Sequence, residues 1–472
     1  MSCIFDKIFT NIILMNEQVQ AEFKKIFNGR FSTSESTRAN YARGEDTYDP
    51  VLSKAVVFPE TNEEVSKVLR LCNEHKIPVV PFGTGTSLEG NVVGNEKGIT
   101  ICLEKMNKIL SVNVEDFDCR VQACVTKEQL NDYLREDGVF FPIDPGANAA
   151  IGGMASAHIS SGTMAVKYGT MKTVISGLTV VLPNGDIVNT GSRTKKTSAG
   201  YNLTNLFIGS EGTLGVITEV QLRLSPIPES IMSAVCHFPT LENAVQTAQQ
   251  VIQYGVPIAR IEMLNKDQMG ISINYSKLKD IEAVPTLFFE FHGSEASNNE
   301  NIKIVEEISK DNNGSSFKWA KDLEERNKLW KARWDVYYSV KALINNGRVY
   351  STDVCLPISN ITECVNYAEE QAKKFGLRAP MVGHLGDGNF HVLLPFDPEN
   401  KETYKKIREF NDLLINKALE LKGTITGEHG VGLHKKEYLL KEHADNIPLM
   451  KLIKRSIDQN NIMNPGKIFD LN

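Results

Sequence analysis

The sequence lacks the spacing that marks a cysteine-based metal site. None of its eight cysteines forms a C-x-x-C pair, which argues against a zinc ribbon or an iron–sulfur cluster and favours reduced, mostly buried thiols. Long runs of Lys or Arg are also missing: 58 acidic and 52 basic residues leave a formal net charge of −6, so nucleic-acid binding is not expected. No stretch reaches the roughly 18 consecutive apolar residues that a transmembrane span needs, which leaves only a peripheral membrane contact open.

The N-terminal residues lack the features of a targeting segment. Asp6 and Lys7 interrupt a short apolar stretch, no small-residue cleavage site follows, and no Arg precedes Arg30. These absences argue against a secretory signal and a mitochondrial transit peptide, so a cytoplasmic location is expected. Met15 offers an alternative start of translation, and the sequence leaves that choice open.

The pattern of the first half predicts an α+β arrangement. A chain of 472 residues, 41% of them hydrophobic, is long enough for about three domain-sized cores. Thr61 and Glu64 have capping-box spacing ahead of a helix predicted over 61–76, and a β-branched strand then runs into a glycine-rich loop. Further short strands are predicted at 99–103, 119–125, 174–182 and 216–224.

A change in composition near Pro226 and Pro228 marks a boundary. The segments that follow alternate between strand and helix patterns: 231–238, 241–254, 257–264, 286–293 and 298–310. An antiparallel sheet with helices on one side would bury their apolar faces, and such a unit typically caps a cofactor domain. A last strong amphipathic helix is predicted over 402–422.

Three segments rich in glycine and small side chains point to a cofactor. Residues 81–90 read PFGTGTSLEG, a run that matches neither the P-loop nor the dinucleotide fingerprint but could form a nest of backbone N–H groups around a pyrophosphate. Alone, it is equally well explained as a tight turn. Residues 144–169 and 208–218 repeat the same character, and the three together favour a bulky, phosphate-bearing cofactor.

Histidines gather near the C-terminus. His384 and His391 flank a Gly-Asp-Gly turn, which can bring both imidazoles to one divalent ion, and Glu428 could complete a His, His, Glu set. His429 would then be a free base near neutral pH. Two histidines seven positions apart mean little alone, but four of the nine lie in the segments 383–391 and 423–435. Asp387 is interpreted as a turn residue, and His434 and His443 as exposed helix residues.

The segment 329–334, LWKARW, places Arg333 beside aromatic residues. Arginine binds a carboxylate through two parallel hydrogen bonds, so Arg333 could hold an acidic substrate. In isolation, the segment is better interpreted as a surface helix whose cations lie along apolar neighbours.

Taken in order, the motifs PFGTGTSLEG, IGG and SGT, GSEGTLG, YSTDVCLP, GHLGDGNFH, TGEHGVG and IMNPGK resemble the FAD-linked D-lactate dehydrogenase and glycolate oxidase large-subunit family, over about residues 50 to 470. That family belongs to the vanillyl-alcohol oxidase and p-cresol methylhydroxylase superfamily. The resemblance implies an α+β fold: a two-subdomain p-cresol-methylhydroxylase-type FAD-binding domain plus an α+β cap domain with an antiparallel sheet. The expected divisions are an N-terminal segment 1–48, the FAD domain 49–227, the cap 228–430, and a C-terminal segment 431–472 that packs back on the FAD domain.

The resemblance also assigns roles to residues. His384, His391 and Glu428 correspond to ligands of a divalent metal (Zn, Mn or Fe), His429 to the catalytic base and Arg333 to the clamp on the substrate carboxylate. FAD is expected to be non-covalent, since no His lies in the pyrophosphate loop. The expected cofactor-binding residues are Pro81, Gly83, Thr84, Gly85, Thr86, Ser87, Gly90, Pro145, Gly146, Gly152, Gly153, Ser161, Gly162, Glu211, Gly212, Gly215, Ile217 and Asn464.

The reaction implied is oxidation of a small D-2-hydroxy acid to the 2-oxo acid. The metal lowers the pKa of the substrate hydroxyl, His429 takes that proton, and the hydride passes to flavin N5. Relatives that act on D-2-hydroxyglutarate place a Lys in the strand of Tyr350 and an Asn at the position of Leu393, so D-lactate or glycolate is the preferred substrate. A D-2-hydroxyglutarate dehydrogenase and the flavin subunit of a multi-subunit glycolate oxidase remain alternatives.

The electron acceptor is left open by the sequence, because no cluster or haem motif is present. A quinone, a cytochrome, an electron-transfer flavoprotein or a partner subunit would serve. We also expect a homo-oligomer.

Overall fold

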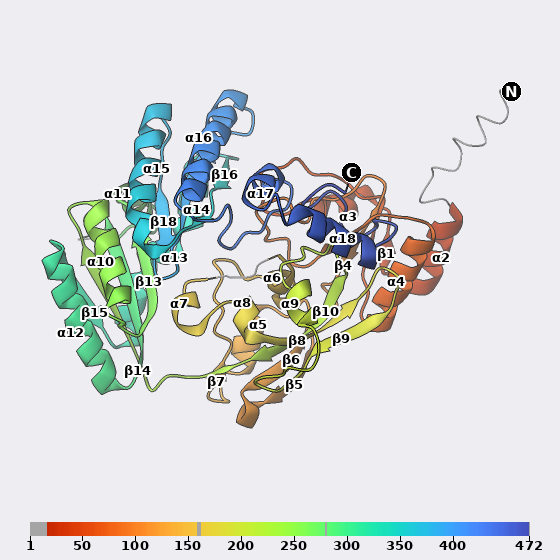
Figure 1. Ribbon diagram of the computed structural model, residues 1–472, viewed down its shortest axis with the longest axis horizontal. Helices are drawn as coiled ribbons and strands as arrows, with labels where there is room; N and C mark the ends of the chain where they lie inside the picture. Colours follow the sequence, from red (N-terminus) through yellow and green to blue (C-terminus); the bar gives the residue numbers. More distant parts are fainter. Residues whose placement is uncertain (1–16, 158–161, 279–280, 472) are drawn as a thin grey trace.

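The computed structural model describes residues 17–157, 162–278 and 281–471. They form two lobes, with the C-terminal segment returning to the first lobe (Figure 1). The α+β fold expected from the sequence is confirmed, with an antiparallel sheet in the second lobe.

The first lobe begins with a four-stranded sheet in the order β1-β2-β4-β3, in which β2, β4 and β3 are parallel. The helix α4 makes the crossover from β2 to β3, and the Thr61 side chain caps it by accepting the Glu64 N–H. The elements of this part are α2 (Glu17–Phe27), β1 (Phe31–Ser32), α3 (Glu35–Asn40), β2 (Ala55–Val57), α4 (Asn62–Glu74), β3 (Val79–Phe82) and β4 (Ile99–Cys102).

A second, antiparallel sheet completes the first lobe in the order β5-β6-β10-β8-β9. Its strands are β5 (Ile109–Asn113), β6 (Asp118–Gln122), β8 (Ile175–Val181), β9 (Ile187–Gly191) and β10 (Val216–Arg223). The connections carry η2 (Val114–Asp116), α5 (Lys127–Tyr133), β7 (Val139–Phe140), α6 (Ile151–Ala157), α7 (Ala165–Tyr168), α8 (Met171–Val174), α9 (Leu203–Phe207) and β11 (Ser225–Pro226). The small-residue helix α6 packs against β10.

The second lobe is one eight-stranded antiparallel sheet in the order β15-β12-β14-β13-β18-β19-β16, with β17 paired to β19. The strands are β12 (Ser230–His237), β13 (Ile258–Leu264), β14 (Thr286–Gly293), β15 (Ser315–Ala320), β16 (Arg348–Ser351), β17 (Val354–Cys355), β18 (Met381–His384) and β19 (Asn389–Phe396).

Helices cover both faces of this sheet, so the expectation of helices on one side was wrong. One face buries the helices α10 (Leu241–Gln253), α12 (Glu295–Asp311), α15 (Ile361–Phe375), which follows η3 (Ile358–Asn360), and α16 (Lys401–Glu420). The other face buries a separate core under α11 (Lys266–Ser276), α13 (Leu323–Trp334) and α14 (Val336–Lys341). Because strand side chains alternate between faces, the strands β12, β13, β14, β16, β18 and β19 contribute buried residues to both cores.

The C-terminal segment carries α17 (Lys436–Glu442) and α18 (Ile447–Ile457). Ile453 and Ile457 pack against the core of the antiparallel sheet of the first lobe, and Met463 bridges to Val79 of β3. The Lys454 ammonium group, buried here, donates to the Thr213 carbonyl.

The described cysteines are all unpaired, and all except Cys355 are buried. Among the residues that the structure describes, no helix is both long enough and apolar enough to cross a bilayer.

Candidate active site

A pocket opens in the first lobe where the three small-residue segments meet. It has an empty volume of about 760 Å³, including its mouth. We call it the cradle. Of the expected cofactor residues, those that line it are Pro81, Gly83, Thr84, Gly85, Thr86, Ser87, Gly152, Gly153, Glu211, Gly212, Gly215, Ile217 and Asn464.

The cradle fits a flat cofactor that bears phosphates. Ser87 and Asn91 line it, and the hydroxyl of Ser87 and the amide oxygen of Asn91 are buried without a hydrogen-bond partner among the described residues, so both could hydrogen-bond to a ligand. Gly83 and Gly153 add no side chain, which lets a ring system lie against the backbone.

Four expected cofactor residues do not line the cradle. Gly90 has a positive φ and lies beside Tyr48 and Leu433, while Pro145 and Gly146 follow the buried Asp144. The N–H of Gly162 donates to the Glu428 carboxylate at 3.1 Å. Ser161 lies outside the described residues.

The second constellation forms at the facing sheet of the second lobe. His384 ends β18 and His391 lies on β19, and the tight turn between them requires Gly388 at φ +84°, where a Cβ would meet the Leu356 carbonyl. Glu428 comes from the loop between α16 and α17. Its Oε1 lies 3.2 Å from Nε2 of His391 and 3.6 Å from Nε2 of His384. One ligand atom from each residue lies within 4.8 Å of the others, so the three can hold one divalent ion.

Both histidines are oriented by a hydrogen bond at Nδ1, the ring nitrogen that does not face Glu428. The Nδ1 atom of His384 lies 2.7 Å from Oε1 of Glu262, and Nδ1 of His391 lies 2.8 Å from the Thr352 carbonyl. Each Nδ1 can therefore donate its proton to an oxygen, so that Nε2, which faces Glu428, is the atom that can give up its proton and bind a metal.

Charge in this centre is concentrated and buried. Burial opposes ionisation of Glu428, but hydrogen bonds and charge from His384 and His391 outweigh it and hold its pKa well below the usual range. Burial also opposes protonation of His384, yet Glu262 and Glu428 raise its pKa to about 10. A divalent ion would have to displace that proton, so metal binding here is coupled to proton release.

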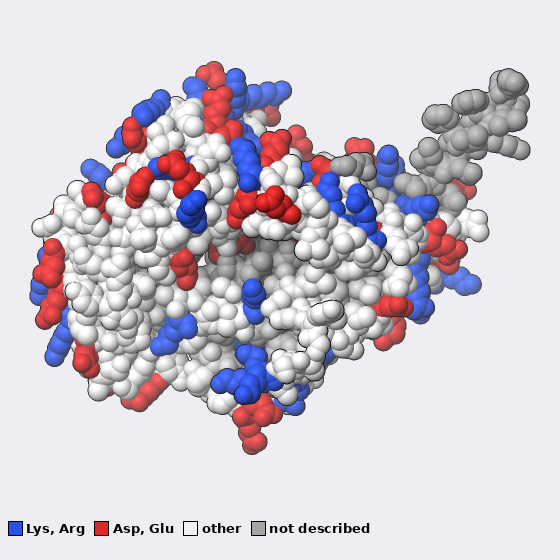
Figure 2. Space-filling model, in the orientation of Figure 1, with Lys and Arg blue, Asp and Glu red and all other residues white. Residues whose placement is uncertain are grey.

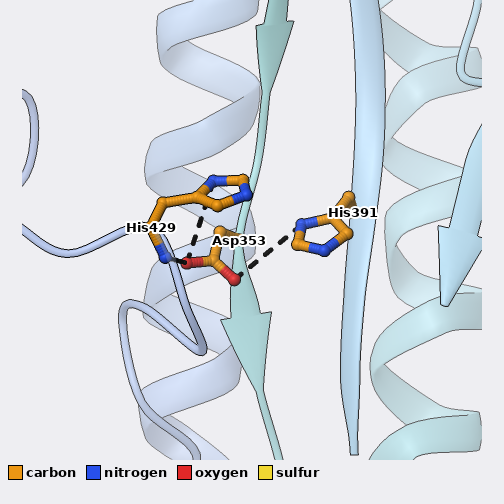
Figure 3. Close-up of side chains that lie close together, drawn as sticks. All are labelled: Asp353, His391 and His429. Carbon is orange, nitrogen blue, oxygen red and sulfur yellow. Dashed lines mark hydrogen bonds and ion pairs between the residues drawn. The ribbon is translucent and has the colours of Figure 1, made fainter. Parts of the chain in front are cut away.

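Asp353 anchors the loop that carries Glu428 and His429. Asp353, His391 and His429 also bring one ligand atom each within 4.8 Å (Figure 3). The oxygens of Asp353, however, accept hydrogen bonds from the backbone N–H of Glu428 and His429 at 3.1 and 2.9 Å, and from Thr426 and Asn389. These donors make Asp353 an anchor of the loop. Burial opposes its ionisation, but the charges of Lys435, His429 and His391 and the hydrogen bond from the His429 N–H outweigh burial and hold the pKa of Asp353 well below the usual range.

His429 stacks on His391, with ring centroids 4.9 Å apart and planes 9° apart. Its Nε2 lies 3.8 Å from Oε1 of Glu428, while its Nδ1 lies 3.5 Å from Oε1 of Glu89. Glu89 comes from the motif 81–90 in the first lobe. Burial lowers the pKa of His429, but Asp353, Glu89 and Glu428 together raise it above the ordinary value.

The prediction that His434 is an exposed helix residue was wrong. His434 is buried, stacks on Tyr48 and points Nδ1 at Glu89 at 3.1 Å. The neighbouring Lys435 is equally buried and pairs with Glu89 at 3.0 Å and with Asp353 at 3.3 Å. The segment 423–435 thus inserts between the lobes instead of forming an exposed surface.

Arg333 lies on α13 and is mostly buried. Its Nε and Nη2 atoms lie 2.8 and 2.7 Å from Oε2 of Glu262, the carboxylate that also contacts His384. Trp334, by contrast, is about half exposed, and its ring lies against the Arg260 guanidinium. Figure 2 shows the surface hollowed between the two lobes, with acidic and basic side chains interspersed around the hollow.

Sequence reasoning missed the three carboxylates that organise this centre, Glu262, Asp353 and Glu89. Glu89 and Asp353 stand inside quoted motifs, so a carboxylate within a motif was an available signal. Glu262 lies in an apolar strand, IARIEML, where one acid among buried residues was the only signal.

The comparisons with known proteins agree with this geometry. Residues 53–191 match an "FAD binding domain" model, and residues 227–468 match a model described as "FAD linked oxidases, C-terminal domain". The second match alone covers more than half of the chain.

The sequence matches to named relatives extend over nearly the whole chain. A probable mitochondrial D-lactate dehydrogenase of Danio rerio is 44% identical over 96% of this chain and 92% of that protein. A mitochondrial D-lactate dehydrogenase [cytochrome] of Arabidopsis thaliana is 40% identical over 96% of this chain and 80% of its own length, and the glycolate oxidase subunit GlcD of Bacillus subtilis is 33% identical over 93% and 94%.

Among solved structures, p-cresol methylhydroxylase with substrate bound superposes with a TM-score of 0.79 at 19% identity, covering 97% of this chain and 98% of that one, which shows the shared fold. The two eukaryotic relatives are named as mitochondrial, which does not support the cytoplasmic location expected from the sequence. The chain belongs to the FAD-linked oxidases, the family of these D-lactate dehydrogenases, and is an FAD-linked oxidoreductase.

Proposed function

We propose that the chain oxidises a small D-2-hydroxy acid, D-lactate or glycolate, to the 2-oxo acid, with FAD and a divalent metal ion. The observation that carries the proposal is the trio His384, His391 and Glu428 with His429 stacked against it. The names of the relatives favour D-lactate as the first substrate to test.

The roles proposed for the side chains follow from their surroundings. His384, His391 and Glu428 would hold the metal through Nε2, Nε2 and Oε1. His429, the base, would take the hydroxyl proton at Nε2, and Arg333 would bind the carboxylate. Bound FAD would supply the hydride acceptor, and the metal (Zn, Mn or Fe) would acidify the hydroxyl.

FAD is proposed to bind without a covalent link. The described residues that line the cradle include no His, Cys or Tyr, the side chains that could attach a flavin. Acid precipitation of the purified chain should therefore release all the yellow colour into the supernatant; colour retained in the pellet would refute this.

We further propose the division into a FAD domain (49–227), a cap (228–430) and a C-terminal segment (431–472) that completes the first lobe. A homo-oligomer and an external electron acceptor remain predictions. For location, the names of the eukaryotic relatives favour the mitochondrion over the cytoplasm, and fractionation of cells that express a tagged chain would decide between the two.

The experiment that tests the function is an anaerobic flavin titration. D-lactate should bleach the flavin absorbance of the purified chain, L-lactate should not, and prior chelation should slow the bleaching. If D-2-hydroxyglutarate reduces the flavin and D-lactate does not, D-2-hydroxyglutarate becomes the proposed substrate. If the flavin is reduced only when a partner subunit is present, the chain is better described as a component of a glycolate oxidase complex. Rapid reduction after complete removal of metal would refute metal assistance.

A further inference from the structure

Two side chains with different proposed roles reach the same buried carboxylate. Glu262 lies on β13 and has no exposed surface. Its Oε1 faces Nδ1 of His384 at 2.7 Å, and its Oε2 faces Nε and Nη2 of Arg333 at 2.8 and 2.7 Å. His384 comes from β18 and Arg333 from α13, so Glu262 joins elements that are about 50 residues or more apart in sequence.

Each contact fixes a property that the site needs. A carboxylate that accepts the Nδ1 proton of His384 holds the tautomer whose Nε2 lone pair can bind a metal, and it increases the basicity of that lone pair. The same carboxylate occupies two donors of the Arg333 guanidinium and so fixes its plane, with Nη1 left for an acidic ligand.

The two contacts also depend on each other. A buried carboxylate is stable as an anion only when a cation or several donors accompany it, and Arg333 supplies a positive charge that stays in contact with Glu262 when a metal displaces the second proton of His384. Through these contacts Arg333 is joined to the metal-binding trio by way of Glu262 and His384. The positive charge of Arg333 acting through space would oppose binding of a cation, so a loss of metal affinity when Arg333 is removed points to the path through Glu262.

We infer that Glu262 is a positioning residue that couples the affinity of the metal site to the carboxylate-binding arginine. The inference rests on the proposed function for the roles of His384 and Arg333. Because coupling between two sites is reciprocal, the change that a metal makes in substrate affinity equals the change that substrate makes in metal affinity.

The neighbouring strand supplies a matched control. Glu290 on β14 is almost as buried as Glu262 and pairs with Arg260 at 3.1 Å, opposite it in register. Glu290 contacts His292 and none of the metal-binding trio. The variant Glu290→Gln thus removes an equivalent buried charge without touching the metal site.

The test measures Mn²⁺ binding to the full-length, FAD-loaded chain after removal of metal, with no substrate present. Free Mn²⁺ is followed by electron paramagnetic resonance. Glu262→Gln should weaken Mn²⁺ binding about 10- to 100-fold. Arg333→Met should weaken it by a smaller factor although Arg333 is no ligand, and Arg333→Lys should restore part of the loss. Glu290→Gln should leave it within about twofold of wild type. Flavin content and urea unfolding of each variant confirm that it is folded.

Two results would overturn the inference alone: a wild-type Mn²⁺ affinity in both Glu262→Gln and Arg333→Met, or equal losses in Glu262→Gln and Glu290→Gln. If Glu262→Gln does not fold, the Mn²⁺ affinities of Arg333→Met and Arg333→Lys test the inference instead: equal, wild-type affinities in both variants would overturn it. A wild-type chain with no saturable Mn²⁺ site would instead overturn the proposed function, and the inference with it.

Discussion

The cradle in the first lobe and the charged centre on the second lobe are built by different means. The cradle is lined by backbone and small side chains from three short segments, with Glu211 as its one carboxylate among the described lining residues. The charged centre is made of side chains on β13, β18, β19 and the loop before α17, held by carboxylates from both lobes.

The difference teaches what each site depends on. A backbone cradle is specified locally, because a few adjacent residues fix both its shape and its donors. A cluster of buried charges is specified by the whole fold, because each charge must be balanced by a partner that only tertiary structure brings near. Substitutions should therefore separate the two sites cleanly, and the following predictions test that separation, starting with the largest effect.

The most direct test removes the proposed base and leaves the cradle intact. His429→Ala should slow anaerobic flavin reduction by D-lactate about 100- to 10,000-fold, because the substrate hydroxyl loses its proton acceptor. Flavin content should be unchanged. His443→Ala, at a partly exposed histidine directly after α17, is the control and should reduce at the wild-type rate. A wild-type rate in His429→Ala would contradict the assignment.

The second test removes Asp353, the anchor of the loop that carries Glu428 and His429. Asp353→Asn should lower the free energy of unfolding by about 3 kcal/mol or more, since Lys435 and two backbone N–H groups lose a buried anion. Urea unfolding at neutral pH measures it. Asp49→Asn is the control: its side chain is 93% exposed and pairs with Arg348 at 3.5 Å, so a change below about 0.5 kcal/mol is expected. Equal losses of unfolding free energy in both variants would show that Asp353 does not stabilise the loop.

The third test concerns the carboxylate of the cradle and its response to pH. Burial raises the pKa of Glu211 to about 7, despite hydrogen bonds from Asn91 and from the N–H groups of Val431 and Gly432. Between about pH 4.5 and 7, Glu211 of the folded chain therefore holds a proton that Glu211 of the unfolded chain has released. The stabilisation that this proton gives to the folded chain is complete below about pH 4.5 and is lost as the pH rises to about 7.

The difference in unfolding free energy between wild type and Glu211→Gln should therefore change by roughly 3 kcal/mol between pH 4.5 and 7 and stay constant above pH 7. Urea unfolding across this range, at saturating FAD, measures it. Parallel pH curves for the two proteins would contradict the raised pKa.

The smallest effect is expected from a single methyl group in the cradle. Gly212 has φ +68°, and a Cβ there would lie 2.9 Å from Cγ of Pro81, whereas Gly200 has φ +82° with nothing within 4 Å. Both Ala variants should lose about 1 kcal/mol of stability from the left-handed backbone. Only Gly212→Ala should also weaken FAD binding, by about tenfold, measured by fluorescence titration of the FAD-free chain, because Pro81 must move. Equal FAD affinity in both variants would show that the cradle tolerates the shift.

The sequence predicted the cradle more completely than the charged centre, because the cradle is formed by residues that are adjacent in sequence. Gly83, Gly85 and Ser87 sit within one short motif, so their spacing already implied a shared site. His384 and His391 could be paired because one hairpin joins them, and they do converge on Glu428 as expected.

The partners of these residues could not be predicted. Glu262 reaches His384 only because β13 and β18 are neighbours in the sheet, with the two residues opposite each other in register. His434 was assigned to an exposed helix, yet Tyr48 and Glu89 of the first lobe cover it. The helices on both faces of the cap sheet were missed because period-2 strands give no indication of which face a later helix will cover.

The loop 426–432 has a consequence for engineering the chain. Its backbone is bound by Glu211 from the first lobe and by Asp353 from the second, and the imidazole of His429 faces Glu89. Neither lobe alone therefore contains the complete charged centre. If caps are exchanged between members of the family, we expect substrate preference to be transferred only when the carboxylates of the first lobe still fit the loop of the new cap. The two lobes are therefore expected to function, and to be redesigned, as a matched pair.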